Sequence, residues 1–366
     1  MKLNIVMLLT NSYNPDVRVY KEAKYLHGLG NNVTILCWDR ECNEDLPAHC
    51  QEEGINIVRF KISSESGSGI KQLPAFIKYI RACKKYLTNT EYDYIHCNDL
   101  DGAITGYFAD KKHSKRVFDM HEVYERGSGI KRKVWRGATI FFIKRSVAAL
   151  YENDDYLGEA YKCIRSKLYE LKNYPDMGMV QYLPKSKSDQ FRIGYHGAVR
   201  GQIPEFNALF EAVKDMDDVR VDINGGGIDL NQLLEMSKHY GNVCVHGPYD
   251  GSKVSSELYE NTDVLFVGYD PENPNYAGNS EAVKYYEAIV TRTPMIITKG
   301  IGMGDKVEKY KFGIACNTRD ADEIRVAIKR LKNNKELLDE FARSENLVAD
   351  YYTWENEVKV LNKIYQ

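Results

Sequence analysis

Short apolar runs alternate with longer amphipathic stretches along this chain, and that alternation limits the fold more than any other feature of the sequence. Five apolar runs in the first half have the length and composition of buried strands: Lys2–Leu9, Asn32–Trp38, Ile55–Phe60, Tyr94–Cys97 and Arg116–Asp119. Near-helical spacing of apolar residues marks the stretches between them: Asp16–Leu29, Leu73–Leu87 and Gly102–Ala109. Strand, helix and strand in this order predict an α/β fold with a parallel sheet and helices on both faces.

The same rhythm restarts after a short polar segment, Pro184–Gln190, which has the composition of a linker. Six further apolar runs follow it: Phe191–His196, Val219–Asn224, Val243–His246, Val264–Gly268, Met295–Thr298 and Gly313–Cys316. A chain of 366 residues is long enough for about two domains. We therefore expect one α/β domain over residues 1–184 and another over 185–350, with ligands bound beyond the carboxyl ends of their strands in a cleft between them.

Charge and cysteine usage narrow the class of protein. Lys and Arg number 50 against 52 Asp and Glu, so the net charge is −2 and we expect no nucleic-acid partner. No apolar run approaches the ~20 residues that span a bilayer, and the N-terminus lacks the pattern of a signal peptide. The eight Cys form no C-x-x-C pair. These features predict a cytoplasmic protein without a zinc ribbon or a disulfide framework.

The stretch from 276 to 297, YAGNSEAVKYYEAIVTRTPMII, carries the strongest chemical signal. Asn279 or Ser280 can cap a helix that runs to about Val290, and Gly278 allows a ligand to approach the backbone. Free N–H groups at such a helix start attract phosphate. Lys284 and Glu287 lie three residues apart on one helix face, where a carboxylate suits the hydroxyls of a ribose. A surface helix with a Glu–Lys pair is the alternative interpretation.

This stretch resembles the donor-binding segment of retaining GT-B glycosyltransferases, in particular glycosyltransferase family 4 and its capsule and cell-surface polysaccharide subgroup. That family places E-x7-E across the turn and helix, and its second glutamate, which matches Glu287, holds the donor ribose. Asn279 stands where the first glutamate would be, and Lys284 precedes the retained one, as in many relatives that make capsules and cell walls. The resemblance implies two Rossmann-like domains facing a cleft, with a C-terminal helix, here 351–366, crossing back to the N-terminal domain.

Two further segments of the second half match the family's donor site. RIGYHGAVR resembles the family's V-G-x-x-R segment. The resemblance implies that Gly197 lies beside the donor and that Arg200 binds the diphosphate. The Lys that the family usually has a few residues later is missing here, and Lys284 is the substitute. INGGGI resembles the strand and G-x-G turn that shapes the nucleotide pocket, which implicates Gly225 and Gly226. The alternative interpretation of Arg200 is an Arg in a surface loop, and that of the three glycines is a tight structural turn.

In the first half, RVFDMHEVYE resembles the family's yD-x-H-E motif. The resemblance puts His121 near the transferred sugar as a catalytic residue and Glu122 beside the acceptor. The strand end YIHCNDLD is similar to another family segment and directs Asp99 to the cleft, and NPDVRVYKE implies that Arg18 binds phosphate or acceptor. A His satisfied by strand-end carbonyls and an Arg on a helix surface are the other interpretations.

Residues 130–150, IKRKVWRGATIFFIKRSVAAL, contain six basic residues and no acidic one, interleaved with aromatic side chains. Such a helix can lie on an anionic membrane surface, or it can be half-buried in its domain. If the acceptor is lipid-linked, contact with the inner face of the cell membrane is expected.

The sequence thus predicts a retaining glycosyltransferase that moves a sugar from a UDP- or GDP-sugar to a glycan or lipid-linked acceptor, in surface polysaccharide biosynthesis. No Asp-x-Asp motif is present, so we expect no essential metal or other cofactor. Two other functions stay open: a sugar-nucleotide 2-epimerase of the same fold, and a non-catalytic partner that binds a sugar nucleotide.

Overall fold

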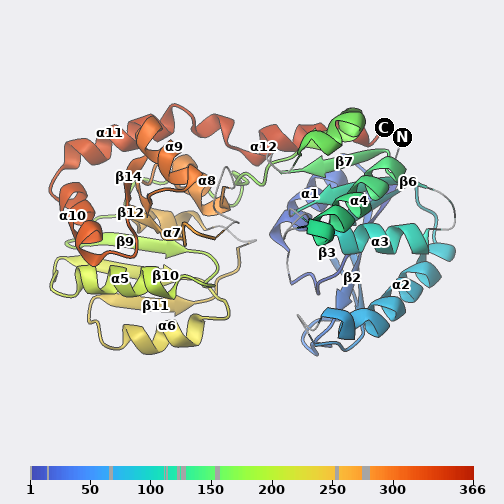
Figure 1. Cartoon of the computed structure of the whole chain (residues 1–366), viewed down its shortest axis with the longest axis horizontal. Helices are drawn as coiled ribbons and strands as arrows, with labels where there is room; N and C mark the ends of the chain where they lie inside the picture. The colour runs from blue at the N-terminus through green and yellow to red at the C-terminus, as the bar shows by residue number, and fades with distance from the viewer. Residues whose placement is uncertain are drawn as a thin grey trace. The chain divides into compact units, whose positions relative to one another are not determined.

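The computed structural model describes residues 2–14, 16–65, 69–110, 112, 114–121, 124, 129–152, 157–251, 255–273 and 281–366. The chain forms two compact units, one made of Met1–Lys172 and Glu357–Gln366 and the other of Asn173–Asn356. Each unit is built on its own sheet, and the elements are labelled in Figure 1. The predicted α/β class with two parallel-sheet domains is confirmed.

The first unit contains, among its described residues, an eight-stranded sheet in the order β3-β4-β2-β1-β5-β6-β7-β8. Its strands are β1 Asn4–Leu9, β2 Asn32–Asp39, β3 His49–Glu52, β4 Ile55–Lys61, β5 Tyr94–Asn98, β6 Lys115–Met120, β7 Ala148–Tyr151 and β8 Leu168–Glu170. Neighbours pair in parallel except β3, which runs antiparallel to β4. Apolar residues of both faces are buried, as parallel sheets covered by helices require.

Four α-helices of the first unit follow its strands: α1 Val17–Gly28, α2 Leu73–Thr88, α3 Asp99–Ala109 and α4 Gly129–Arg145. Asp16 caps α1, because its carboxylate accepts a hydrogen bond from the N–H of Val19 at 3.2 Å. The chain returns to this unit at its end through α13, Leu361–Ile364. There Tyr94 donates a hydrogen bond to the Gln366 carbonyl at 3.0 Å, and its ring packs on Tyr365.

The second unit has a six-stranded sheet of described residues in the order β11-β10-β9-β12-β13-β14. These strands are β9 Phe191–His196, β10 Val219–Asn224, β11 Val243–Gly247, β12 Val264–Val267, β13 Met295–Thr298 and β14 Gly313–Cys316, all paired in parallel. Its helices are α5 Ile203–Val213, α6 Leu230–Ser237, α7 Ser256–Glu260, α8 Val283–Val290, α9 Gly302–Tyr310, α10 Ala321–Lys332 and α11 Lys335–Asn346, followed by α12 Trp354–Glu357.

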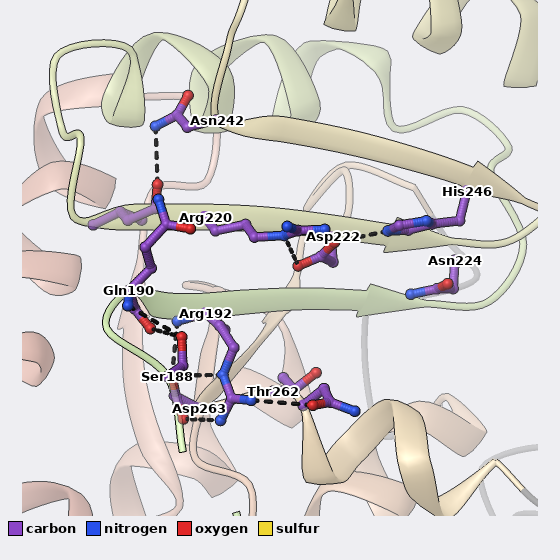
Figure 2. Close-up of polar contacts among 12 residues, drawn as sticks. Ser188, Gln190, Arg192, Arg220, Asp222, Asn224, Asn242, His246, Thr262 and Asp263 are labelled. Carbon is purple, nitrogen blue, oxygen red and sulfur yellow. Dashed lines mark hydrogen bonds and ion pairs between the residues drawn. The ribbon is translucent and has the colours of Figure 1, made fainter. Parts of the chain in front are cut away.

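One face of β9 and β10 is apolar and the other is polar. Ile193 and Val221 point into a core shared with α5, whereas Arg192, Arg220 and Asp222 alternate with them along the strands. Figure 2 shows Arg220 and Asp222 together on β10, with dashed lines joining the carboxylate to its two partners. On this polar face Arg192 and His196 of β9 are buried, whereas Arg220 and Asp222 of β10 are partly exposed.

The elements differ from the sequence predictions at three places. Strands β3, β7 and β8 were not predicted, and β7 takes up the last part of the basic segment 130–150, so the helix there ends at Arg145. The helix expected from Ser280 begins at Val283. The first unit ends at Lys172 rather than at 184, because residues before the predicted linker already bond to the second unit, as Ser255 N–H does to the Met179 carbonyl at 2.9 Å.

Glu345 on α11 is fully buried, and neither of its carboxylate oxygens has a hydrogen-bond partner among the described residues. Burial raises the pKa of this carboxyl well above its usual range, and Lys185 only partly opposes the effect. Folding therefore favours the protonated acid, so the stability of the second unit falls as the pH rises above the pKa of the unfolded chain.

We expect Glu345→Gln to stabilise the second unit, with a gain that grows between pH 5 and pH 8 by up to about 1.4 kcal/mol per pH unit. Urea denaturation at several pH values measures this directly. Glu336→Gln, an exposed site on the same helix, is the control and should change little. A Glu345→Gln gain that stays constant with pH would contradict the assignment of a buried, protonated carboxyl.

Candidate functional site

The carboxyl edge of the second sheet holds a buried ammonium group that belongs to Lys284, in the first turn of α8. This side chain is only 7% exposed, and its Nζ lies 3.5 Å from the centre of the Tyr195 ring and 5.8 Å from that of Tyr269. Nζ has no hydrogen-bond partner among the described residues. The faces of two aromatic rings attract the cation but do not neutralise it.

Burial lowers the pKa of Lys284 to about 7, and the nearby carboxylate of Glu287 only partly opposes this. His196, at the end of β9, has its pKa lowered to about 3, first by burial and then by Lys284. Its ring is therefore neutral and contacts Thr262 Oγ1 at 3.0 Å. The buried positive charge is thus that of Lys284, which has an incomplete set of partners among the described residues, as a site for an anion would have.

Glu287 lies one turn further along α8 and is half-buried. Tyr259 donates a hydrogen bond to its Oε2 at 2.6 Å. Burial and proximity to Glu287 also raise the pKa of Tyr249, which places a second tyrosine beside this carboxylate. The side chain therefore stands among aromatic hydroxyls, in surroundings that suit recognition of sugar hydroxyls.

The predicted glycines bring two loops of this edge together. A Cβ on Gly225 would lie 1.8 Å from the Gly197 carbonyl oxygen, and a Cβ on Gly197 would lie 3.0 Å from Lys284 Nζ. Gly197 also has φ of +133°, a backbone conformation that L side chains rarely adopt. Gly226 packs on Pro248 in the same way. Only glycine permits this approach, so these residues set the position of Lys284 against the turn after β9.

Of the other predicted donor residues, the structure describes Arg200, whose side chain forms no ion pair with a described residue. Arg200 is exposed, and its backbone N–H rather than its guanidinium is bonded, to Gln202 Oε1 at 2.8 Å. Gly278, Asn279 and Ser280 lie outside the described residues. Their contribution to a phosphate site stays a prediction.

In the first unit, Asp119 at the end of β6 is the centre of a buried charge cluster. Arg18 on α1 binds it through Nη2 at 2.8 Å and Nε at 3.2 Å, and also contacts Glu22 Oε1 at 3.2 Å. His121 Nε2 lies 2.6 Å from Asp119 Oδ2, the oxygen that Arg18 Nε also contacts. Although burial opposes ionisation, Arg18 and His121 outweigh it and hold the pKa of Asp119 well below its usual range.

Arg18, which the sequence predicts to bind phosphate or acceptor, is largely enclosed. Its side chain is only 6% exposed and pairs with two carboxylates. Its Nη1 has no hydrogen-bond partner among the described residues. A contact with phosphate or acceptor stays a prediction.

His96 on β5 extends the same cluster to the end of the chain. Its Nε2 lies 3.1 Å from Glu22 Oε2 and its Nδ1 lies 2.5 Å from Tyr365 Oη. Burial opposes the charged ring, but the bonds to Asp119 and Glu22 outweigh burial and raise the pKa of His96 to about 9. A charged imidazole thus joins α1, β5 and the C-terminal segment.

His121 is more accessible, with 15% of its side chain exposed. Burial lowers the pKa of His121. The carboxylate of Asp119 opposes burial, and the net result is a pKa raised to about 9. Its backbone N–H donates to Asp99 Oδ1 at 3.3 Å, and Tyr124 donates to the same oxygen at 2.6 Å. Asp99 has a left-handed backbone, with φ of 60°, which is strained for a non-glycine residue. Glu122 lies outside the described residues.

A group of possible metal ligands occurs in this cluster, since Glu22, Asp119 and His121 offer atoms within 4.8 Å of one another. Arg18 contacts both carboxylates, however, and His121 Nε2 is bonded to Asp119. These residues are already joined by ion pairs among themselves, and a cation would have to displace the guanidinium. The cluster fits a structural role better than a metal site.

The first half of α4 presents apolar and basic side chains to solvent. Ile130 is 82% exposed and Val134 is 62% exposed, and Trp135 is partly exposed beside them. Lys131, Arg132 and Lys133 are exposed in the same turns. None of the described helices is long and apolar enough to cross a membrane.

Several residues of both sites were not predicted from the sequence. His96 and His196 lie inside or at the end of apolar runs and read as core positions, and Tyr195 and Tyr259 likewise read as core. A signal existed for Glu22, which is four residues after Arg18 on the same helix face. No spacing signal links Tyr365 to His96, because 269 positions separate them.

No protein-family model matches the sequence, and no curated protein matches it. Among solved structures, the chain is similar to a sucrose-phosphate synthase from Thermosynechococcus elongatus, with a TM-score of 0.76, 14% identity and coverage of 100% of this chain and 98% of the other. It is also similar to Anabaena Alr3699/HepE in complex with UDP and glucose, with a TM-score of 0.67, 14% identity and coverage of 99% of both chains. A third similar structure is the catalytic domain of starch synthase IV from Arabidopsis thaliana, bound to ADP and acarbose. Its TM-score is 0.68 at 12% identity, with coverage of 100% of this chain and 99% of the other. The fold is the GT-B fold that these proteins share.

We expect His96→Gln to destabilise the first unit by about 3 kcal/mol near pH 6, because a rise in pKa from 6.5 to about 9 on folding stabilises the charged ring. That contribution is complete below the unfolded pKa and is lost as the pH rises through 9. Urea denaturation at pH 6 and above pH 9 measures the difference. His239→Gln, at an exposed histidine of the second unit, is the control, and a His96→Gln effect that is equal at both pH values would refute the charged ring.

Proposed function

We propose that this chain is a glycosyltransferase that takes a sugar from a nucleotide-diphosphate sugar and transfers it to an acceptor hydroxyl. The observation that carries the proposal is the buried, unpaired ammonium of Lys284 at the carboxyl edge of the second sheet. In open α/β sheets ligands bind at this edge. A buried cation that the nearby Glu287 only partly compensates becomes more favourable when an anion binds, and a diphosphate is an anion of suitable charge.

Ligands named for the similar structures support this donor class. Anabaena Alr3699/HepE is described in complex with UDP and with UDP-glucose, and a trehalose-6-phosphate protein from E. coli is described bound with UDP-2-fluoro glucose. All are nucleotides or nucleotide sugars. The identities are low, so these descriptions support the donor class and do not choose between UDP and GDP for this chain.

Within the donor site, Glu287 is proposed to hold the ribose, since its carboxylate lies one helical turn from Lys284. Arg200 is proposed to fold onto the diphosphate from the exposed loop after β9 and to share the charge with Lys284. Gly278, Asn279 and Ser280 are proposed to offer backbone N–H groups to the donor. As the bond to the sugar breaks, negative charge grows on the diphosphate, and these cations stabilise it.

The finer parts of the proposal concern the acceptor side. The acceptor is a glycan or lipid-linked hydroxyl, which attacks on the face that the diphosphate leaves and passes its proton to phosphate, so that the configuration is retained. His121 is proposed to hydrogen-bond a sugar hydroxyl, which fits a ring that is partly exposed and held by Asp119. A role in surface polysaccharide synthesis is inferred from the family resemblance. Asp99 and Glu122 are proposed to lie near the acceptor.

Lys284→Met keeps the volume and the apolar surroundings of the side chain but removes its charge. We expect it to weaken UDP binding at least about tenfold while leaving uridine binding unchanged, because only UDP carries the phosphates. Wild-type affinity for UDP should also fall as the pH rises above about 7, since the free protein then loses the Lys284 proton, whereas the variant should not show this fall. Titration calorimetry with both ligands measures these effects.

Glu287→Gln is the matched comparison on the same helix. If Glu287 holds the ribose, the substitution weakens the binding of UDP and of uridine by the same factor. This result separates a contact to the nucleoside from a contact to the phosphates. Equal UDP affinity in wild type and Lys284→Met would remove the phosphate site. UDP binding without sugar transfer to any acceptor would instead support the non-catalytic alternative.

We also propose that the first half of α4 contacts an anionic membrane surface. Replacement of Lys131, Arg132, Lys133 and Arg136 by Glu should reduce co-sedimentation with phosphatidylserine vesicles at least about a hundredfold, because each cation near such a surface contributes about 1 kcal/mol. Binding to vesicles of neutral lipid should be weak for both proteins.

The control for this experiment changes charge equally at another place. Glu substitutions at four exposed cations of the second unit, Lys214, Lys238, Lys309 and Lys329, give the same net charge without touching α4. Equal loss of vesicle binding in both variants would mean that net charge, and not α4, is responsible.

A further inference from the structure

A second hollow of the second unit lies at the opposite edge of its sheet from Lys284. Its volume is about 760 Å³. Phe191 begins β9, Asp263 precedes β12 and Pro294 precedes β13, so the hollow lies where the parallel strands start. The linker around Lys185 and helix α11 form its walls. The proposed donor site, at the carboxyl ends of the strands, is therefore separate from it.

The lining of this hollow is strongly basic in a chain of net charge −2. Its six cations are Lys185, Lys187, Arg292, Lys332, Lys335 and Arg343, and its two carboxylates are Asp263 and Asp339. Lys332 is paired with Asp218, and Asp263 is bound by Arg192 outside the set. The other five cations form no ion pair with any residue that the structure describes.

A nearby polar hollow of about 410 Å³ shows the contrast. There Arg220 and His246 both bind Asp222, at 2.8 and 2.7 Å, and Arg192 binds Asp263 at 2.8 Å, as the dashed lines in Figure 2 show. These three cations of the polar hollow are neutralised within the protein, whereas most cations of the basic hollow are not.

Arg292 is the most constrained of the unpaired cations. It follows the end of α8 with φ of 53°, in the left-handed region that is strained for a residue with a side chain. Its guanidinium carbon lies 3.9 Å from the centre of the Tyr182 ring, and its buried Nε has no hydrogen-bond partner among the described residues. The fold therefore holds this guanidinium in one place, stacked on an aromatic face, with hydrogen-bonding capacity left over.

Lys185 completes the inner part of the hollow. Its Nζ donates to the Tyr259 carbonyl at 2.9 Å and to Thr293 Oγ1 at 2.6 Å, which are both neutral acceptors. Burial lowers its pKa to about 8 despite the nearby Glu345 and Asp263. An anion placed beside it would favour the charged form and replace part of the hydration that burial removes.

We propose that this hollow binds a small organic phosphate, whose phosphate contacts Arg292, Lys335 and Arg343 and whose carbon part lies against Phe191, Pro294 and Leu338. The size of the hollow is that of a small-molecule pocket rather than a flat docking surface. The cations supply charge-assisted hydrogen bonds to phosphate oxygens, and the apolar residues at the strand starts favour an organic group over inorganic phosphate. The inference does not depend on the proposed donor function.

Isothermal titration calorimetry of the full chain with phenyl phosphate tests the site. The background is Lys284→Met, so that phosphate binding at the other edge does not contribute. We expect phenyl phosphate to bind in this background, through the basic hollow alone. Adding Lys335→Glu with Arg343→Glu, or Arg292→Gln alone, should weaken it at least about tenfold, because each removes a charge-assisted contact. Inorganic phosphate should bind more weakly than phenyl phosphate.

The control pair is Lys238→Glu with Lys309→Glu, two exposed cations of the same unit outside the hollow, which should leave the affinity unchanged. Equal weakening by the control pair would reduce the effect to net charge and overturn the site. Binding that survives in the hollow variants, or that disappears with Lys284→Met alone, would also overturn it. Weak UDP binding with intact phenyl phosphate binding would instead count only against the proposed donor function.

Discussion

Burial of charge organises both units, and each unit handles it differently. In the first unit the carboxylate of Asp119 binds Arg18 and His121, while Glu22 binds His96, so that each of these five groups has a partner of opposite sign. Such a cluster is costly to desolvate and depends on all its members, because removal of one leaves another uncompensated. It fixes the relative positions of α1, β5 and β6.

In the second unit the compensation is incomplete at the carboxyl edge of the sheet. Lys284 is buried against aromatic rings, its Nζ has no hydrogen-bond partner among the described residues, and the close approach of Gly225 to Gly197 brings the turn after β9 up to it. The packing that surrounds Lys284 thus holds a cation in an environment that favours its neutral form. Desolvation of Lys284 costs the empty protein free energy. An anionic ligand restores part of that free energy when it binds, and this contributes to its affinity. The proposed donor chemistry follows from that difference.

The sequence was sufficient for the fold and less so for the sites. Buried parallel strands are continuous apolar runs, which is why β1 and β9 could be predicted, whereas the short polar edge strand β3 carries no such signal. The contact between His96 and Tyr365 could not be found, since a His within an apolar run and a Tyr at the end of the chain give no indication that they meet. Spacing also cannot reveal that Lys284 Nζ lacks a hydrogen-bond partner among the described residues, because that property depends on everything packed around it. Nor does it reveal that Arg18, predicted at a ligand, also pairs with Asp119.

The position of Tyr365 in the chain has a consequence for how this protein is made. His96 and Tyr365 belong to one unit, yet the whole of Asn173–Asn356 lies between them in sequence. During synthesis the ribosome therefore releases every residue of the second unit before the first can acquire its last buried hydroxyl. The segment translated first is completed last, and until then the imidazole of His96 lacks the phenol that closes it off from solvent.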